Sequence, residues 1–445
     1  MKNTQLAKRA LTVAAGAAAV ALALTGCNAS GGGSGTGANG VTDLKLIMNP
    51  GPEADAMTKV MAAYNAGPGA KDKIHAAVDQ LSRTDTYAKE ATLMSTKSAD
   101  YDFYQTASYY IAQHAQYMEP LSLNSSQYYK SSLDSLNVGG KQYGIPLDPS
   151  VHMVFYRKDL IPGMLQDKAN FEKISNQVLG KTLDPKTPDQ WNWDDYIASA
   201  AYFTQQYNPA SPTKYGTALQ AKNLVYNAMV WDDALYNNGG SWLDKSGKPN
   251  LDSPEAATAV NDYRTIYTKG LTSPDSDQAE YPETQAALTS GNAAFALQWN
   301  AAYDQLNDPA QSPKTAGKIG IARVPGTDHL SHVHTLAIGV NKYGKHVAQA
   351  QKFIAYLDTV DAMKTYVGAG GLASMPAALQ GQQSDSVTAL EGILKDGTYA
   401  EPKLARAFDI YTAIANDLSG AWVGQGNVND ALKKANSDLA SLSGK

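Results

Sequence analysis

Cysteine and arginine are the residues that this sequence has least of. Its 445 residues include one cysteine, Cys27, which excludes a disulfide within the chain. Arginine occurs only six times, and acidic residues outnumber basic ones to give a formal net charge of −5. A nucleic-acid-binding protein normally shows an excess of basic residues, so this balance argues against such a partner. Beyond residue 24, no apolar run approaches the roughly 18–20 residues that span a bilayer as a helix.

The N-terminus has the layout of a secretory signal. Three basic residues among the first nine precede an apolar run at 11–24, which is too short for a membrane-spanning helix. The sequence Leu24-Thr25-Gly26-Cys27 resembles the lipobox of bacterial lipoproteins. The resemblance implies cleavage before Cys27 and a diacylglycerol on its sulfur, which would hold the protein on a membrane surface. The alternative is an ordinary signal followed by an unrelated cysteine.

Two compositional boundaries follow from the N-terminal pattern. We expect residues 1–26 to be a lipoprotein signal peptide and residues 27–40, which are rich in Gly and Ser, to be a lipid-anchored tether. The remainder, 41–445, is longer than one hydrophobic core usually serves, so two lobes are predicted.

Strand-like and helix-like stretches alternate after residue 41. The spacing of apolar residues predicts strands at 44–48, 74–78 and 101–105, with helices at 54–64, 84–96 and up to 117. This alternation is typical of a parallel α/β lobe, in which ligands bind at the carboxyl ends of the strands. Residues 49–53 and 106–110 therefore lie at the expected binding edge.

The later part of the chain continues the α/β pattern. Asn192 should cap a helix that begins at Trp193, with Asp195 in its first turn. A turn at Pro146-Leu147-Asp148 should separate a short strand from an apolar strand at 151–156. Further helices are predicted at 223–240, 254–269 and 346–357 and over most of 361–442, and further strands at 293–299, 318–326 and 332–342.

Five short motifs resemble those of one family. They are Tyr143-Gly144-Ile145-Pro146 followed by a Phe155–Leu160 segment, the helix start at 193–196, the strand at 291–297, and the loop at 370–376. Their order and spacing resemble the extracellular solute-binding proteins of carbohydrate ABC importers, the family of maltose-binding protein. The resemblance runs from about residue 44 to residue 442.

This resemblance implies an α/β fold with two lobes, an inter-lobe ligand cleft and a hinge. Lobe one would comprise 43–148 and 315–360, and lobe two 150–314 and 361–445. The protein would be a lipid-anchored monomer on the extracellular face of the cytoplasmic membrane. It would capture a neutral mono- or oligosaccharide and deliver it to an ABC permease, without a cofactor or a metal.

The resemblance also implies ligand-binding positions. Ser108 and Tyr109 follow the third strand, where family members often have an acidic residue that is missing here. Trp299 and Asn300 end the 293–299 strand, and Trp299 is expected to pack on a sugar ring. The remaining candidates are Asp148, Asn227, Trp231, Asp232, Tyr303, His334, Gly370 and Gly371.

Each of several candidates has a structural alternative. Asp148 could cap a turn, Trp231 could be a core residue, and the Gly370-Gly371 pair could end a helix. His329, His332 and His334 have metal-like spacing. However, they fall on a strand and the loop before it, and a metal site would need further ligands.

Other classes of function fit the sequence less well. A secreted glycoside hydrolase needs two carboxylates in a defined pair, and no such pair stands out, so we expect no enzyme activity. A receptor for glycerol phosphate or another anion would need positive charge in its cleft, and no arginine lies among the candidates. A polyol remains an alternative to a sugar.

Overall fold

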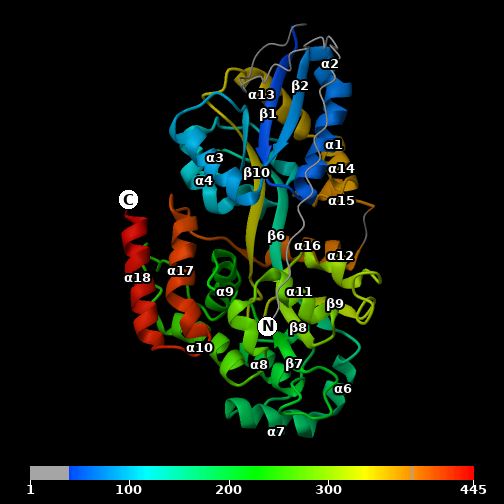
Figure 1. Ribbon diagram of the computed structural model, residues 1–445, viewed down its shortest axis with the longest axis vertical. Helices are drawn as coiled ribbons and strands as arrows, with labels where there is room; N and C mark the ends of the chain where they lie inside the picture. Colours follow the sequence, from blue (N-terminus) through cyan, green and yellow to red (C-terminus); the bar gives the residue numbers. More distant parts are fainter. Residues whose placement is uncertain (1–39, 382–383, 445) are drawn as a thin grey trace, which may run out of the picture. The chain divides into compact units, whose positions relative to one another are not determined.

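The computed structural model describes residues 40–381 and 384–444 (Figure 1). Cys27, the predicted signal and residues 27–39 of the predicted tether lie outside the described residues. The main sheet has the order β2-β1-β3-β10-β6-β8-β7, with β9 paired to β6 and β11 paired to β10. Its strands are β1 (Thr42–Met48), β2 (Ile74–Gln80), β3 (Phe103–Ala107), β6 (Ile145–Arg157), β7 (Tyr215–Ala218), β8 (Ala293–Trp299), β9 (Ile319–Ala322), β10 (Ser331–Val340) and β11 (Thr398–Tyr399). A separate two-stranded sheet consists of β4 (Asn137–Val138) and β5 (Lys141–Gln142).

The first lobe is built on the parallel strands β1, β2 and β3. β1 pairs with β2 from Thr42↔Ile74 to Met48↔Gln80, which confirms the predicted alternation of strands and helices. One face of this sheet packs on apolar side chains of α1, including Met57 and Val60. The helices that follow these strands are α1 (Pro52–Ala66), α2 (Pro68–Asp72), α3 (Arg83–Ser95), α4 (Ser108–His114) and α5 (Lys130–Ser135).

Two long antiparallel strands connect the lobes. In Figure 1, β6 and β10 run between the end of the sheet that carries β1 and β2 and the end that carries β7 and β8. The predicted turn at Pro146-Leu147-Asp148 is wrong, because β6 is one strand of 13 residues. Proline cannot donate to a strand ladder. Pro146 and Pro149 are accommodated where the β6–β10 register shifts, between Thr335 and Ala337.

The second lobe has a larger core. Trp191, Trp242, Phe295 and Trp422 are fully buried in it. The predicted cap of α8 is confirmed, since Asn192 and Asp195 form a reciprocal capping box. Its helices are α6 (Ile161–Gln166), α7 (Lys168–Leu179), α8 (Trp193–Tyr202), α9 (Val225–Asn237), α10 (Pro254–Thr268), α11 (Tyr281–Thr289), α12 (Ala302–Asn307), α17 (Ala407–Trp422) and α18 (Val428–Ser443).

The packing moves two of the expected lobe boundaries. Helix α13 (Val347–Leu357) contributes to the first core, as expected for the 315–360 segment. Helices α14 (Val360–Gly368) and α15 (Pro376–Leu379) contribute to the same core, so this part of the 361–445 segment packs with lobe one. Conversely, β9 pairs with the second half of β6, at Val154↔Ala322, so this part of the 315–360 segment packs with lobe two. Helix α16 (Asp385–Asp396) packs on a third cluster that contains Val151 and Phe155. An amphipathic pattern shows that a face is buried, but not in which core.

None of the described helices, within 40–381 and 384–444, is long and apolar enough to cross a membrane.

Candidate functional site

Polar and aromatic side chains share one face of the strands that connect the lobes. Opposite residues of paired strands point to the same face of a sheet. In this sheet, His334 of β10 lies opposite Ser150 of β6, and Trp299 of β8 lies opposite His152 of β6. Because residues two apart share a face, Asp148 and His332 belong to this face as well. It is the side of β6 opposite to Val151, Met153 and Phe155.

A group of aromatic rings covers this face where the two lobes meet. Tyr109 of α4 contacts the rings of His334 and Phe408, at centroid distances of 5.5 and 5.8 Å. Tyr110 stacks on Phe408 of α17 with centroids 4.9 Å apart and an interplanar angle of 24°. We call Tyr87, Tyr109, Tyr110, Trp299, His334 and Phe408 the junction cluster.

The junction cluster joins side chains from both lobes. Tyr87 on α3 contacts Tyr110 at 4.9 Å, and Trp299 contacts His334 at 4.8 Å. Tyr109 packs with the core of the second lobe, although α4 follows a strand of the first. Burial, followed by the nearby Tyr226, raises the pKa of Tyr87 to about 12, so its hydroxyl is neutral at physiological pH. The cluster therefore offers apolar ring faces and neutral polar tips.

Sequence reasoning found part of this cluster. Tyr109, Trp299 and His334 are among the predicted ligand-binding residues, and Tyr110 lies within the expected binding edge at 106–110, although it is not one of the named candidates. Tyr87 and Phe408 were missed. Phe408 lies on a helix about 300 residues further along the chain, and nothing in its local sequence indicates the contact.

Two other candidates near the first core are buried. Asp148 accepts a hydrogen bond from the backbone N–H of Leu372 at 3.0 Å, and burial, together with the charge of Glu53, raises its pKa well above the ordinary value. The buried Oγ of Ser108, at the start of α4, has no hydrogen-bond partner in the described part of the chain. Ser108 and Asp148 thus remain candidates for hydrogen bonding to a ligand.

Gly370 and Gly371 lie in the turn that directly follows helix α14. The N–H of Gly371 donates to the carbonyl of Tyr366 at 3.1 Å, and Gly370 has a φ of +101°. A Cβ on Gly371 would lie 2.2 Å from the Tyr366 ring. These contacts account for both glycines without a ligand.

The candidates on α9 occupy the core of lobe two. Trp231 is fully buried against Trp422, with ring centroids 6.0 Å apart. Asn227 donates to the carbonyls of Lys222 and Ala279, both at 3.0 Å. Asp232 accepts a bond from the indole N–H of Trp242 at 3.0 Å, and burial raises its pKa to about 8. These contacts give all three residues partners in lobe two. One polar atom of each, Asn227 Oδ1, Trp231 Nε1 and Asp232 Oδ2, is buried without a hydrogen-bond partner among the described residues, so their expected role in the cleft stays a prediction.

Asn300 and Tyr303 also have structural partners. The Oδ1 of Asn300 accepts a bond from the N–H of Val151 at 3.1 Å, which extends the pairing of β8 with β6. Tyr303 packs on Phe155, on the opposite face of β6, and its hydroxyl donates to Asp385 at 3.4 Å. Trp299 is thus the one residue of the expected trio, Trp299, Asn300 and Tyr303, that joins the junction cluster.

Two buried histidine–carboxylate pairs lie beside the junction cluster. His152 Nδ1 is 2.6 Å from Asp233 Oδ2, and His332 Nε2 is 2.7 Å from Glu401 Oε2. Burial opposes the charge on His332, but Glu401, together with the aspartates of α9, raises its pKa. Burial likewise opposes the charge on Glu401, but the bond from His332 lowers the pKa of Glu401. Both shifts favour an ion pair of His332 with Glu401.

The histidines of the 329–334 segment have separate roles. The ring of His329 bonds to the carbonyl of Val324 at 2.9 Å, apart from His332 and His334. Within the described residues, no three His, Cys, Asp or Glu side chains are placed to hold a metal ion.

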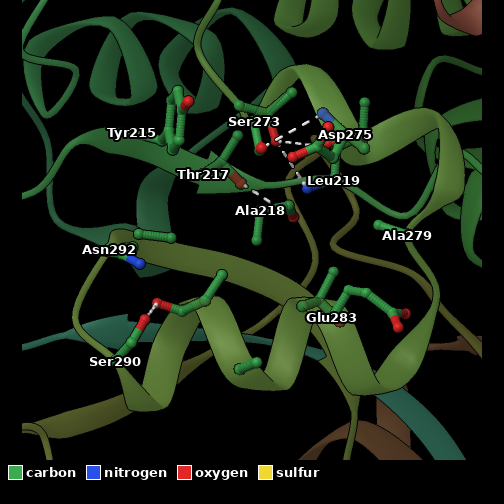
Figure 2. A pocket seen from close by; sticks show the side chains of 16 residues that line it. Tyr215, Thr217, Ala218, Leu219, Ser273, Asp275, Ala279, Glu283, Ser290 and Asn292 are labelled. Atoms are coloured by element: carbon green, nitrogen blue, oxygen red, sulfur yellow. Dashed lines mark hydrogen bonds between the residues drawn. The ribbon is translucent and has the colours of Figure 1, made fainter. Parts of the chain in front are cut away.

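A cavity of about 450 Å³ lies elsewhere in lobe two, between β7 and α11. Figure 2 shows Tyr215 and Thr217 on the strand wall of this cavity and Glu283 on the helix wall. It shares no residue with the junction cluster or with the candidate set from the sequence.

Comparison with known proteins agrees with this architecture. Residues 50–364 match the model of the family described as "Bacterial extracellular solute-binding protein". A "Probable ABC transporter-binding protein" of Deinococcus radiodurans is 25% identical over 305 residues, which cover 67% of this chain and 64% of that relative. The chain therefore spans less than two thirds of this relative's length.

Solved structures share the fold at low sequence identity. MalE3 of T. maritima with bound maltose has a TM-score of 0.72 and 20% identity, covering 90% of this chain and 99% of that one. A solute-binding protein of Agrobacterium radiobacter K84 in complex with ribitol has a TM-score of 0.70 and 20% identity, covering 91% and 99%. The expected two-lobed α/β fold is confirmed. Since the family model matches most of its length, this chain belongs to the bacterial extracellular solute-binding proteins.

Proposed function

We propose that this protein captures a neutral sugar or polyol at the junction cluster and delivers it to an ABC permease. The observation that carries the proposal is the stack of Tyr110 on Phe408, which brings ring faces from the two lobes together at 4.9 Å. Sugar rings have an apolar C–H face and a rim of hydroxyls. Aromatic faces bury the first, and tyrosine, serine and carboxylate groups bond to the second.

The geometry also requires movement. A centroid separation of 4.9 Å leaves no room for a ligand between Tyr110 and Phe408. Ligand entry must therefore separate the lobes, which β6 and β10 connect. Binding then favours closure by the difference in the ligand's affinity for the two states. In this proposal lobe one donates Ser108, Tyr109 and Tyr110, and lobe two donates Trp299 and Phe408. The connecting strands β6 and β10 donate Asp148 and His334.

The ligand class follows from the chemistry of the cluster and from the relatives. The six residues of the junction cluster include neither arginine nor lysine, which disfavours a phosphate or other strong anion. The two structural neighbours described above hold maltose and ribitol, both of which are neutral and rich in hydroxyls. A receptor that binds such a compound and releases it unchanged needs no catalytic group.

A ligand panel tests this proposal. Thermal unfolding of the protein should be measured with maltose, ribitol, D-mannitol and glycerol 3-phosphate. We expect at least one neutral compound to raise the unfolding temperature, because a ligand that binds only the native state stabilises it by mass action. Chromatography of the bound compound should recover it unchanged. Stabilisation by glycerol 3-phosphate alone, or turnover of maltose, would contradict the proposal.

The membrane anchor is a separate part of the proposal. We expect Cys27 to carry the lipid that holds the receptor at the extracellular face of the membrane, beside its permease. Cells grown with a labelled fatty acid should label the protein, and Cys27→Ala should remove that label. Equal labelling of both proteins would exclude Cys27 as the anchor.

A further inference from the structure

The ring of Trp299 contacts two imidazole rings. The His152 ring is 4.0 Å from the Trp299 ring at an interplanar angle of 73°, and the His334 ring is 4.8 Å away at 69°. Trp299 is half-buried, whereas the side chain of His152 is fully buried. Both contacts are edge-to-face, an arrangement that depends on the angle between the rings. The orientation of the indole is therefore tied to the orientation of the His152 ring.

Asp233 fixes the ring of His152. One carboxylate oxygen lies 2.6 Å from His152 Nδ1. The other accepts bonds from the Tyr399 hydroxyl and from the backbone N–H of His332, both at 2.9 Å. These partners come from β11 and β10, and Asp233 itself is on α9. With three donors around it, the carboxylate cannot turn without breaking a buried hydrogen bond.

The second ring nitrogen of His152, Nε2, makes no hydrogen bond within the described part of the chain. Nε2 is buried, and a buried polar atom without a partner costs about 1–3 kcal/mol. A carboxylate can only accept, so Nδ1 of His152 carries the proton that faces Asp233. The bond between Nδ1 and Asp233 therefore sets the angle of this ring, and Nε2 adds no bond of its own.

We infer that His152 is a positioning residue for Trp299. In this inference Asp233 holds the tautomer and the ring angle of His152, and His152 in turn holds the Trp299 indole in the orientation that binds the ligand. This inference rests on the proposed function, because it takes the junction cluster as the ligand site. His152 acts through Trp299 and does not touch the ligand. Asp233→Asn is the sharpest change, since an amide of the same shape can donate to Nδ1 and move the proton to Nε2.

The first experiment needs no ligand. The emission of Trp299 is obtained as the difference between the protein and its Trp299→Phe variant, in the presence and absence of acrylamide. The other five tryptophans are at most 5% exposed, so Trp299 dominates the accessible signal. We expect His152→Phe and Asp233→Asn each to change the quenching of this component by twofold or more. Tyr399→Phe, which removes a bond to the same carboxylate but keeps the His152 pair, is the matched control and should change it little.

The second experiment measures coupling by calorimetric titration with maltose. His152→Phe should weaken binding about tenfold when Trp299 is present and less than twofold in the Trp299→Ala background, because residues that act through one another are not additive. Equal losses in both backgrounds, or unchanged quenching in the first experiment, would overturn the positioning role. If maltose does not bind, the titration uses the neutral compound of the panel that stabilises the protein most. If Trp299→Ala leaves affinity for the bound compound unchanged, the proposed site fails, and the quenching experiment decides the positioning role alone.

Discussion

The two faces of strand β6 differ in what they contact. One is apolar, and the other, called the polar face here, carries Ser150 and His152 and continues into the buried Val154 of the second core. Val151, Met153 and Phe155 pack on α16 and α12 in a buried cluster. On the other face, Ser150 and His152 lie beside Trp299 and His334 of the junction cluster. The same 13 residues therefore support the core and the candidate site on alternate positions. Substitutions on one face should change stability, and those on the other should change ligand affinity.

Phe155→Ala, on the apolar face of β6, should cause the largest loss of stability. The side chain is fully buried, so its loss leaves a cavity and should lower the free energy of unfolding by about 3–5 kcal/mol. Urea unfolding of both proteins measures this change. Sugar affinity of the folded variant should be unchanged, and a loss of affinity that exceeds the loss of stability would show that the two faces are coupled.

Glu401→Gln should break the buried ion pair with His332, which lies beside the polar face. We expect it to lower the free energy of unfolding by roughly 3 kcal/mol near pH 5.5. The lowered pKa of Glu401 gives stability that is present above its ordinary pKa of 4.5 and is lost as pH falls through the lowered value. The raised pKa of His332 gives stability that is full below its ordinary pKa of 6.5 and is lost as pH rises through the raised value.

The pair should therefore contribute most between about pH 4.5 and 6.5. Unfolding of the wild type and of Glu401→Gln across pH 3–9 checks the sign. The difference between the two proteins should be largest in this window and smaller on both sides. A difference that grows steadily with pH would contradict the ion pair.

Trp299→Ala, beside the polar face of β6, should change ligand affinity more than stability. We expect sugar affinity to fall tenfold or more, about 1.4 kcal/mol, while the unfolding temperature without ligand falls little, because this indole is only half-buried. Calorimetric titration and thermal unfolding of the one variant supply both numbers. A large loss of stability with unchanged affinity would make Trp299 a core residue.

Ser150→Ala should give the smallest effect on stability, within about 0.5 kcal/mol. Ser150 is half-buried on the polar face, opposite His334. Unfolding in urea should barely distinguish the variant from the wild type. It thus serves as the control for polar-face substitutions, and a loss comparable to that of Phe155→Ala would remove the distinction between the faces.

Much of the fold could be predicted from local sequence. The alternation of β1, α1, β2 and α3 follows from apolar spacing, and the cap of α8 follows from Asn192 and Asp195, because both depend on residues within a few positions of one another. The prediction failed at β6, where Pro146 and Asp148 suggested a turn. There the distant strand β10 accommodates the prolines through a shift of register.

The site was only partly predictable. Strand ends pointed to Tyr109 and Trp299, because parallel strands present their carboxyl ends at one edge of the sheet. Trp231 and Asp232 are buried in lobe two, which the sequence did not show, since an amphipathic helix does not reveal whether a face meets a cleft or the core of its own lobe. Phe408 was missed for a related reason, because only packing across the lobes brings it to Tyr110.

The sequence by itself determined the class of fold, the family and the signal-like N-terminus of this protein. These depend on local periodicity and short motifs, which act over one or two turns of the chain. Only the tertiary structure decided which lobe α14 and β9 join, which aromatic rings meet, and that His152 is held by Asp233. The physical reason is that such contacts join residues far apart in the chain, and a core selects them by shape and by the cost of leaving buried polar groups unpaired.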